Sequence, residues 1–237
     1  MTLTETGPPA APSWPDDPGH LLYDHLLRTA RTTGRCPVWI RPDDLELPLD
    51  GPTGPAALAA AIGAVDPDAV LDRWWPGPCR PGCPCGERLP AAIPRIPGPA
   101  GPDRSLAPAT FDAAVDLAGG YGSSLAVVDA ARPADVPAAL GWPGICNYVP
   151  YQDLVSLSAV LRHWEDRWGA VVVALNRSRM TLSVAYPPTT DAECTEVAAE
   201  HIAFCPDQQD PQNGDYYTLS IYSRMIRGAG AWSFWWD

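Results

Sequence analysis

The sequence has few basic residues and no long apolar run. It carries 16 Lys and Arg against 28 Asp and Glu, which gives a formal net charge of −12. Nucleic acids and anionic membranes bind proteins through cationic faces, so we expect neither as a partner. No run of about 18 apolar residues is present that could span a membrane, and residues 1–7 lack the basic start and apolar core of a signal peptide. We therefore expect a cytoplasmic protein.

Several signatures of known chemistry are also missing. The chain has no Walker A motif, no GxGxxG after a strand, no GxSxG and no HExxH. With only 4 His, histidine-rich metal chemistry is excluded, and 7 Cys in a chain of this length argue against a disulfide framework. What the sequence does contain is 46% hydrophobic residues and 10 Trp, enough to bury a substantial core.

Proline divides the chain, because most of the 29 prolines precede residue 110. We expect a disordered tail over residues 1–18, a helix and strand region over 19–75, a connection rich in Pro, Gly and Cys over 76–109, and a regular domain over 110–237. In the second region, His20 to Thr33 has helical spacing and Gly34 ends it. Asp66 followed by Pro67 is typical of a helix start.

The second half alternates helices and strands. Asp153 to Trp168 is the clearest helix, Thr190 and Glu193 form a capping box for another, and Asp215 can cap a last one. Residues 125–128 indicate a buried strand, and residues 171–175 and 180–185 a hairpin. These elements predict an α/β or α+β fold, with a mixed sheet covered by helices and a smaller, proline-rich N-terminal part leaning on it.

The chain ends in a tryptophan-rich strand, residues 231–237. Alternation places Trp232, Phe234 and Trp236 on one face, with Ser233 and Trp235 on the other. Burying each large aromatic contributes about 1.5–3 kcal/mol, so this end must be held by the sheet or by a partner. We expect the sheet.

Three segments together resemble a known bacterial family. They are Leu157 to Gly169, Ala199 to Asp207 and Trp232 to Asp237, with Leu140-Gly141-Trp142 and Asn147 upstream. Their order and spacing resemble DUF4253, a family of unknown function, over about residues 123–237. The resemblance implies no reaction and no cofactor. It implies that the three segments are neighbours in the fold, so we expect any binding site where they meet, with Asn147, Trp164, Arg167, Trp232 and Trp236 as candidates.

Two groups of residues could carry chemistry. His201 and Cys205 lie four residues apart on one predicted helix, with Asp207 just beyond its end, and a Cys–His pair is the minimum for nucleophilic catalysis. The other interpretation is a packed cysteine and a helix-face histidine, hydrogen-bonded to Asp207. Glu165 would join a catalytic site only if it pointed into a cleft beside Trp164; otherwise Arg162 to Arg167 form an exposed charged face with i, i+4 pairs.

A cysteine cluster is the third candidate. Cys79, Cys83 and Cys85 lie within seven residues of a Pro- and Gly-rich loop, and thiolates suit the tetrahedral site of Zn²⁺. Cys36 could be the fourth ligand. The spacing is not a common zinc pattern, and the alternative is a flexible loop with incidental thiols. We therefore expect no cofactor, and a structural zinc ion in this loop is the alternative that the cysteines leave open.

Our leading functional hypothesis is a non-catalytic protein that binds another protein, as a regulatory or immunity-type module. Its acidic charge suits a basic partner such as a toxic nuclease. The alternative hypotheses are an enzyme of unknown reaction that uses His201, Cys205, Asp207 and Glu165, and a small structural zinc site in the Cys-rich loop.

Overall fold

The computed structural model describes residues 18–40, 54–78, 89–97, 101–121, 124–148, 152–209 and 217–237. Within these ranges the chain has an α+β fold with eight α-helices and one mixed sheet, as the sequence predicts. The helices are α1 (Pro18–Thr33), α2 (Pro55–Gly63), α3 (Pro67–Trp74), α4 (Pro108–Ala118), α5 (Val136–Leu140), α6 (Leu154–Trp168), α7 (Asp191–Phe204) and α8 (Leu219–Met225). The strands are β1 (Arg35–Ile40), β2 (Ser124–Asp129), β3 (Ala170–Leu175), β4 (Arg179–Val184) and β5 (Ala231–Trp235).

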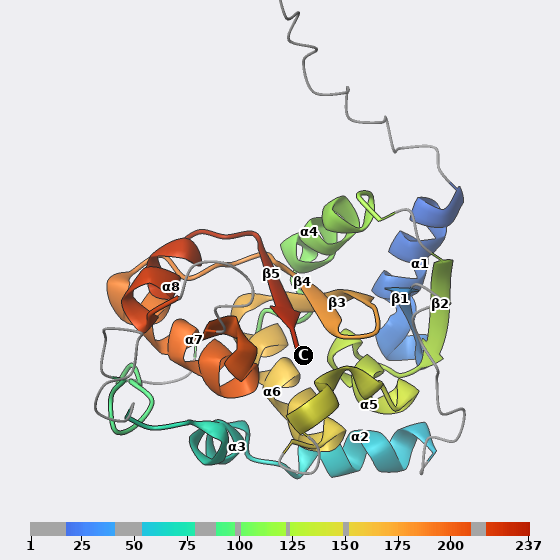
Figure 1. Cartoon of the computed structure of the whole chain (residues 1–237). Helices are drawn as coiled ribbons and strands as arrows, with labels where there is room; N and C mark the ends of the chain where they lie inside the picture. Colours follow the sequence, from blue (N-terminus) through green and yellow to red (C-terminus); the bar gives the residue numbers. More distant parts are fainter. Residues whose placement is uncertain are drawn as a thin grey trace, which may run out of the picture.

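The five strands form one sheet in the order β2-β1-β3-β4-β5. Strand β1 runs parallel to β3, with Trp39 opposite Ala174, and the other neighbours are antiparallel. Strand β1 comes from the N-terminal part of the chain yet lies between two strands of the C-terminal part. The sheet therefore joins the two parts, which the sequence could not reveal (Figure 1).

Helices cover both faces of this sheet. One face packs against α1 and α4 through an apolar cluster that contains Tyr23, Leu27, Trp39, Ala114 and Val171. The opposite face carries the larger core, which includes side chains of α3, α6, α7 and α8. Figure 1 shows α4 on one side of strands β3 to β5, and α6 and α7 on the other. The alternation of Val171 and Val172 between the two cores is the period-two pattern of a strand buried on both faces.

Local signals in the sequence set the helix ends. Asp66 caps α3 by accepting hydrogen bonds from the N–H groups of Asp68 and Ala69, and the capping box of Thr190 and Glu193 opens α7. Helix α6 ends at Gly169, whose φ of 59° favours glycine. A Cβ atom there would lie 2.5 Å from Thr110 Oγ1, so packing demands glycine as well.

Two local predictions were wrong. Strand β2 was expected to be buried, but it is an edge strand in which only Val128 is buried. The apolar run of β2 has a neighbouring strand on one side only. The place of a strand in the sheet depends on long-range contacts, which local composition does not report. Helix α8 is capped by Thr218, which accepts a hydrogen bond from Ile221 N–H, whereas Asp215 lies outside the described residues.

The terminal strand confirms the sequence prediction. Strand β5 pairs antiparallel with β4, with Trp232 opposite Leu182. Trp232, Phe234 and Trp236 are buried, while Ser233 is exposed. The sheet therefore holds this chain end. Among the described helices, none combines the length and apolar character needed to cross a lipid bilayer.

Candidate functional site

The three segments of the family resemblance meet in an aromatic cluster. The indole of Trp164, from α6, lies 4.9 Å from the ring of His201 on α7, and 5.7 and 5.6 Å from Trp232 and Phe234 on β5, between ring centroids. All four side chains are buried. The predicted neighbourhood of these segments is therefore confirmed, but the junction is a sealed core. Trp164, Trp232 and Trp236, which we expected to bind a partner, are core residues instead.

His201 is enclosed by this cluster. Its Nδ1 lies 3.0 Å from the hydroxyl of Tyr222, and its Nε2 is buried without a hydrogen-bond partner among the described residues. Burial lowers the pKa of His201 to about 3, so the imidazole is neutral at physiological pH. The predicted hydrogen bond to Asp207 is wrong, because Tyr222 takes that place.

Cys205 does not form a working pair with His201. Its backbone N–H donates to the carbonyl of His201, as one helical turn requires, but its Sγ donates to the carbonyl of Trp235 at 3.0 Å. The thiol is buried, and burial raises its pKa well above the usual value. A thiol that stays protonated is a poor nucleophile. The geometry therefore agrees with a packed cysteine. Among the described residues, no opening exposes the thiol to a substrate.

Asp207 anchors the end of the chain. Its carboxylate accepts a hydrogen bond of 2.6 Å from the hydroxyl of Tyr148 and one of 2.9 Å from the backbone N–H of Asp237. Asn147, which is exposed, donates from Nδ2 to the carbonyl of Asp237 at 2.9 Å. Both residues were candidates for chemistry or binding, and the structure gives both a role in holding the terminal strand.

Glu165 is buried in an ion-pair network rather than in a cleft. Arg31 lies 3.0 Å from its carboxylate, Arg132 lies 3.4 Å away, and the N–H of Ala134 donates to it at 3.3 Å. Burial raises the pKa of Glu165, and the two guanidinium groups oppose that shift. The expected exposed i, i+4 pairs are wrong as well. Arg162 instead makes a bidentate pair with Asp135, at 2.6 and 2.8 Å.

The predicted zinc ligands Cys79, Cys83 and Cys85 lie outside the described residues. Cys36, the suggested fourth ligand, is described and buried in the main core. Its pKa is raised well above the usual value, chiefly by burial. A neutral thiol packed among apolar side chains is not poised to bind a metal ion, because a ligand thiol must be a thiolate.

A polar cavity of about 620 Å³, which the sequence did not indicate, lies open beside this core. It lies between α3, residues 95–97 and 101–104, α6 and the first turns of α7. Its lining is mostly charged and consists of Asp68, Asp72, Arg95, Ile96, Pro97, Gly101, Arg104, His163, Arg167, Trp168, Glu193 and Glu196. Of the predicted site residues that the structure describes, Arg167 alone lines it.

Two arginines organise the carboxylates at this cavity. Arg95 contacts Asp68 at 3.0 Å, Asp72 at 3.1 Å and Glu200 at 2.9 Å. Arg167 pairs with Glu196, and its guanidinium stacks 4.6 Å from the ring of Trp168. Acidic residues thus gather around guanidinium groups that come from other segments.

Glu200 connects the cavity to the aromatic core. It is fully buried behind the cavity, where its Oε2 accepts a hydrogen bond of 2.8 Å from the indole N–H of Trp164. Burial raises the pKa of Glu200, and His163 is the main group that opposes the shift. One atom each of Asp68, His163 and Glu200 lies within 4.8 Å of the others, a combination able to hold a metal ion. Glu196 and Glu200, which lie four residues apart on the alanine-rich helix α7, were the signal in the sequence that could have indicated this site.

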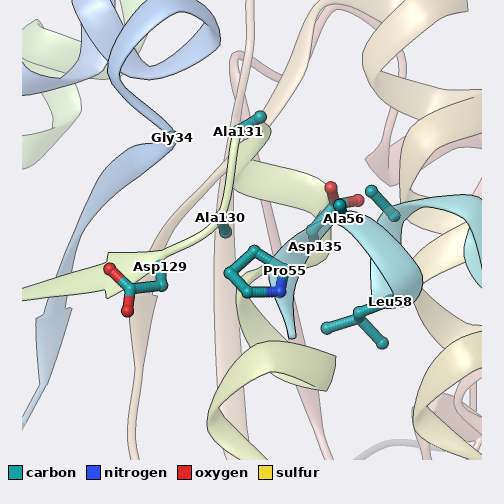
Figure 2. A pocket seen from close by; sticks show the side chains of 9 residues that line it. Gly34, Pro55, Ala56, Leu58, Asp129, Ala130, Ala131 and Asp135 are labelled. Carbon is teal, nitrogen blue, oxygen red and sulfur yellow. The ribbon is translucent and has the colours of Figure 1, made fainter. Parts of the chain in front are cut away.

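A second cavity is much smaller. Figure 2 shows it at the start of α2. It has a volume of about 130 Å³ and is lined mainly by Pro55, Ala56, Leu58 and Ala130. The carboxylate of Asp135 at its edge is already held by Arg162. Space for only a few atoms and a largely apolar wall make this cavity a weaker candidate than the polar one.

The fold and the site define an α+β protein with a mixed sheet, whose tryptophan-rich terminal strand forms one edge and packs on a sealed aromatic core. A charged cavity lies beside this core. Residues 124–237 match the model of DUF4253, a domain of unknown function. This match confirms the family resemblance for that part of the chain. No curated protein and no solved structure matches the chain.

Proposed function

We propose that the protein is a non-catalytic, cytosolic binding protein whose polar cavity takes a basic group of another protein. The observation that carries the proposal is the arrangement around Arg95. Asp68 and Asp72, one turn apart on α3, have side chains that are 57% and 62% exposed, and both already hold a guanidinium group. Side chains placed in this way recognise arginine or lysine.

The carboxylates at the rim keep capacity for a second cation. An ionised carboxylate offers about four acceptor positions, and Arg95 meets one oxygen of Asp68 and one of Asp72. Glu193 adds a third acid to the rim. A space of about 620 Å³ accommodates a long basic side chain without moving the backbone.

Net charge supports the same kind of partner. A protein with a formal charge of −12 attracts basic proteins and accelerates their encounter, most strongly at low ionic strength. A regulatory or immunity-type module that neutralises a basic protein, such as a nuclease, would use this attraction. The enzyme hypothesis receives less support, because His201, Cys205 and Glu165 are all buried.

Affinity capture with three forms of the protein tests the proposal. Tagged wild type, Asp72→Lys and Asp116→Lys are expressed in the native host and captured at low and high salt. Asp116 is an exposed acid on α4 that does not line the cavity, so its variant changes the charge equally at another place.

We expect wild type and Asp116→Lys to retain the same basic protein at low salt, and Asp72→Lys to lose it. High salt should weaken the retention. Equal retention by Asp72→Lys, or a retained partner without a basic surface, would contradict the proposal.

A further inference from the structure

Three helices bring a mixed set of metal-binding atoms together at the inner end of the cavity. Asp68 comes from α3, His163 from α6 and Glu200 from α7, and one ligand atom of each lies within 4.8 Å of the other two. One imidazole nitrogen and two carboxylate oxygens form a donor set that first-row divalent metals accept. The residues lie far apart in the sequence, so the fold alone creates the set.

The spacing is close to what one ion requires. Metal–nitrogen and metal–oxygen bonds of about 2.0–2.2 Å place two ligand atoms roughly 3–4 Å apart. A small movement of one side chain shortens separations of up to 4.8 Å to that range. Asp68 can make this movement, because its side chain is more than half exposed.

His163 and Glu200 each present an atom that fits a ligand role. The Nε2 atom of His163 is buried and has no hydrogen-bond partner among the described residues, which is unusual for a buried polar atom. In Glu200, the indole N–H of Trp164 holds Oε2 and leaves Oε1 facing cations. Such a supporting hydrogen bond is how proteins orient metal ligands.

Arg95 supplies the positive charge next to these carboxylates. Its Nη1 lies 2.9 Å from Glu200 and 3.0 Å from Asp68, between two of the three ligands. A metal ion would have to displace this nitrogen. Arg95 could then stay on the surface through Asp72, which its Nη2 contacts at 3.1 Å.

We propose that Asp68, His163 and Glu200 bind one divalent first-row transition metal ion in exchange for the Arg95 guanidinium. This site is separate from the Cys-rich loop and does not depend on the proposed binding of a basic partner. It opens through Asp68 into the polar cavity, which gives an ion a path from solvent.

Manganese is the appropriate probe, since Mn²⁺ favours nitrogen and oxygen ligands and the thiols of the Cys-rich loop do not compete for it. The full chain is treated with a chelator and titrated with Mn²⁺, and free Mn²⁺ is followed by electron paramagnetic resonance. Wild type should bind one ion per chain. His163→Gln and Glu200→Gln should each weaken binding by at least about tenfold.

Arg95→Gln is the decisive variant, because removing the competing cation should tighten Mn²⁺ binding by about tenfold or more. His25→Gln, an exposed histidine on α1, is the matched control and should bind as wild type does. Circular dichroism confirms that each variant is folded. Absence of a bound ion in both wild type and Arg95→Gln, or equal affinity in wild type and His163→Gln, would overturn the site.

Discussion

The indole N–H of Trp164 donates a hydrogen bond of 2.8 Å to the carboxylate of Glu200. This contact links the sealed aromatic core to the charged cavity, since Trp164 packs against the terminal strand and Glu200 lies beneath Arg95. A buried carboxylate needs such partners, because an unpaired charge in the interior is costly. The aromatic core therefore holds the Glu200 carboxylate that pairs with Arg95.

Trp164→Phe tests this link. The variant removes the indole N–H, leaves part of the Glu200 charge unsatisfied and creates a small void, so it should lower the free energy of unfolding by about 2–4 kcal/mol. Urea denaturation measures the change. Trp235→Phe, at a half-buried position on the other face of β5, is the control and should cost less than about 1 kcal/mol. Equal losses in the two variants would show that the contact is unimportant.

The Arg95 and Glu200 pair should behave as a coupled unit. Arg95→Gln leaves the buried Glu200 carboxylate without its closest cation and should cost about 2 kcal/mol at pH 7, a value reduced because Arg95 is partly exposed. Glu200→Gln added to Arg95→Gln should recover most of the loss, since the amide still accepts from Trp164. Denaturation of the two single variants and the double variant gives the coupling. Additive losses would argue against a direct interaction.

The burial of His201 predicts that the free energy of unfolding decreases in acid. Its pKa is about 3 in the folded protein and about 6.5 in an unfolded chain, so below pH 6.5 protons bind the unfolded state first. The stabilising contribution is present above pH 6.5 and falls away as the pH drops towards 3, by about 5 kcal/mol in all.

His201→Gln should flatten the dependence of unfolding free energy on pH between 6.5 and 4. Val197→Ala is the control, because it weakens the same buried helix without removing a titratable group. Its curve should run parallel to that of wild type at lower stability. A His201→Gln curve as steep as the wild-type curve would refute the assignment.

Asp207 and Asn147 should contribute unequally to holding the chain end. Asp207 is buried and accepts two hydrogen bonds, so Asp207→Ala should cost about 2–3 kcal/mol. Asn147 is exposed, and Asn147→Ala should cost less than about 1 kcal/mol. Hydrogen exchange of the Trp236 amide, which donates to the carbonyl of Ser178, should speed up far more in the first variant. Similar rates in both would contradict the anchoring role of Asp207.

The elements that the sequence predicted correctly depend on neighbouring residues. The Asp66 cap, the capping box at Thr190 and the alternation of the terminal strand are signals within a few positions, and each is present in the structure. The meeting of Trp164, His201 and Trp232 followed from a family pattern rather than from periodicity.

The cavity could not be predicted in the same way, because its contacts are long-range. Arg95 and Glu200 are 105 positions apart, and Ile96, whose N–H donates to Glu196, is 100 positions from it. No local pattern reports such a pairing. The clue that was available is Glu196 and Glu200 on either side of the apolar run Val197 to Ala199, since buried acids are rare unless they are paired.

The polar cavity, and not the sealed junction of His201 and Cys205, is the proposed place where the protein binds its partner. The most direct measurement compares the affinity of the captured basic partner for wild type, Asp72→Lys and Cys205→Ala by titration calorimetry. The cavity variant should lose at least about tenfold in affinity, because a repulsive charge replaces an attractive one, and Cys205→Ala should bind as wild type does. Loss of binding in Cys205→Ala with full affinity in Asp72→Lys would contradict the claim.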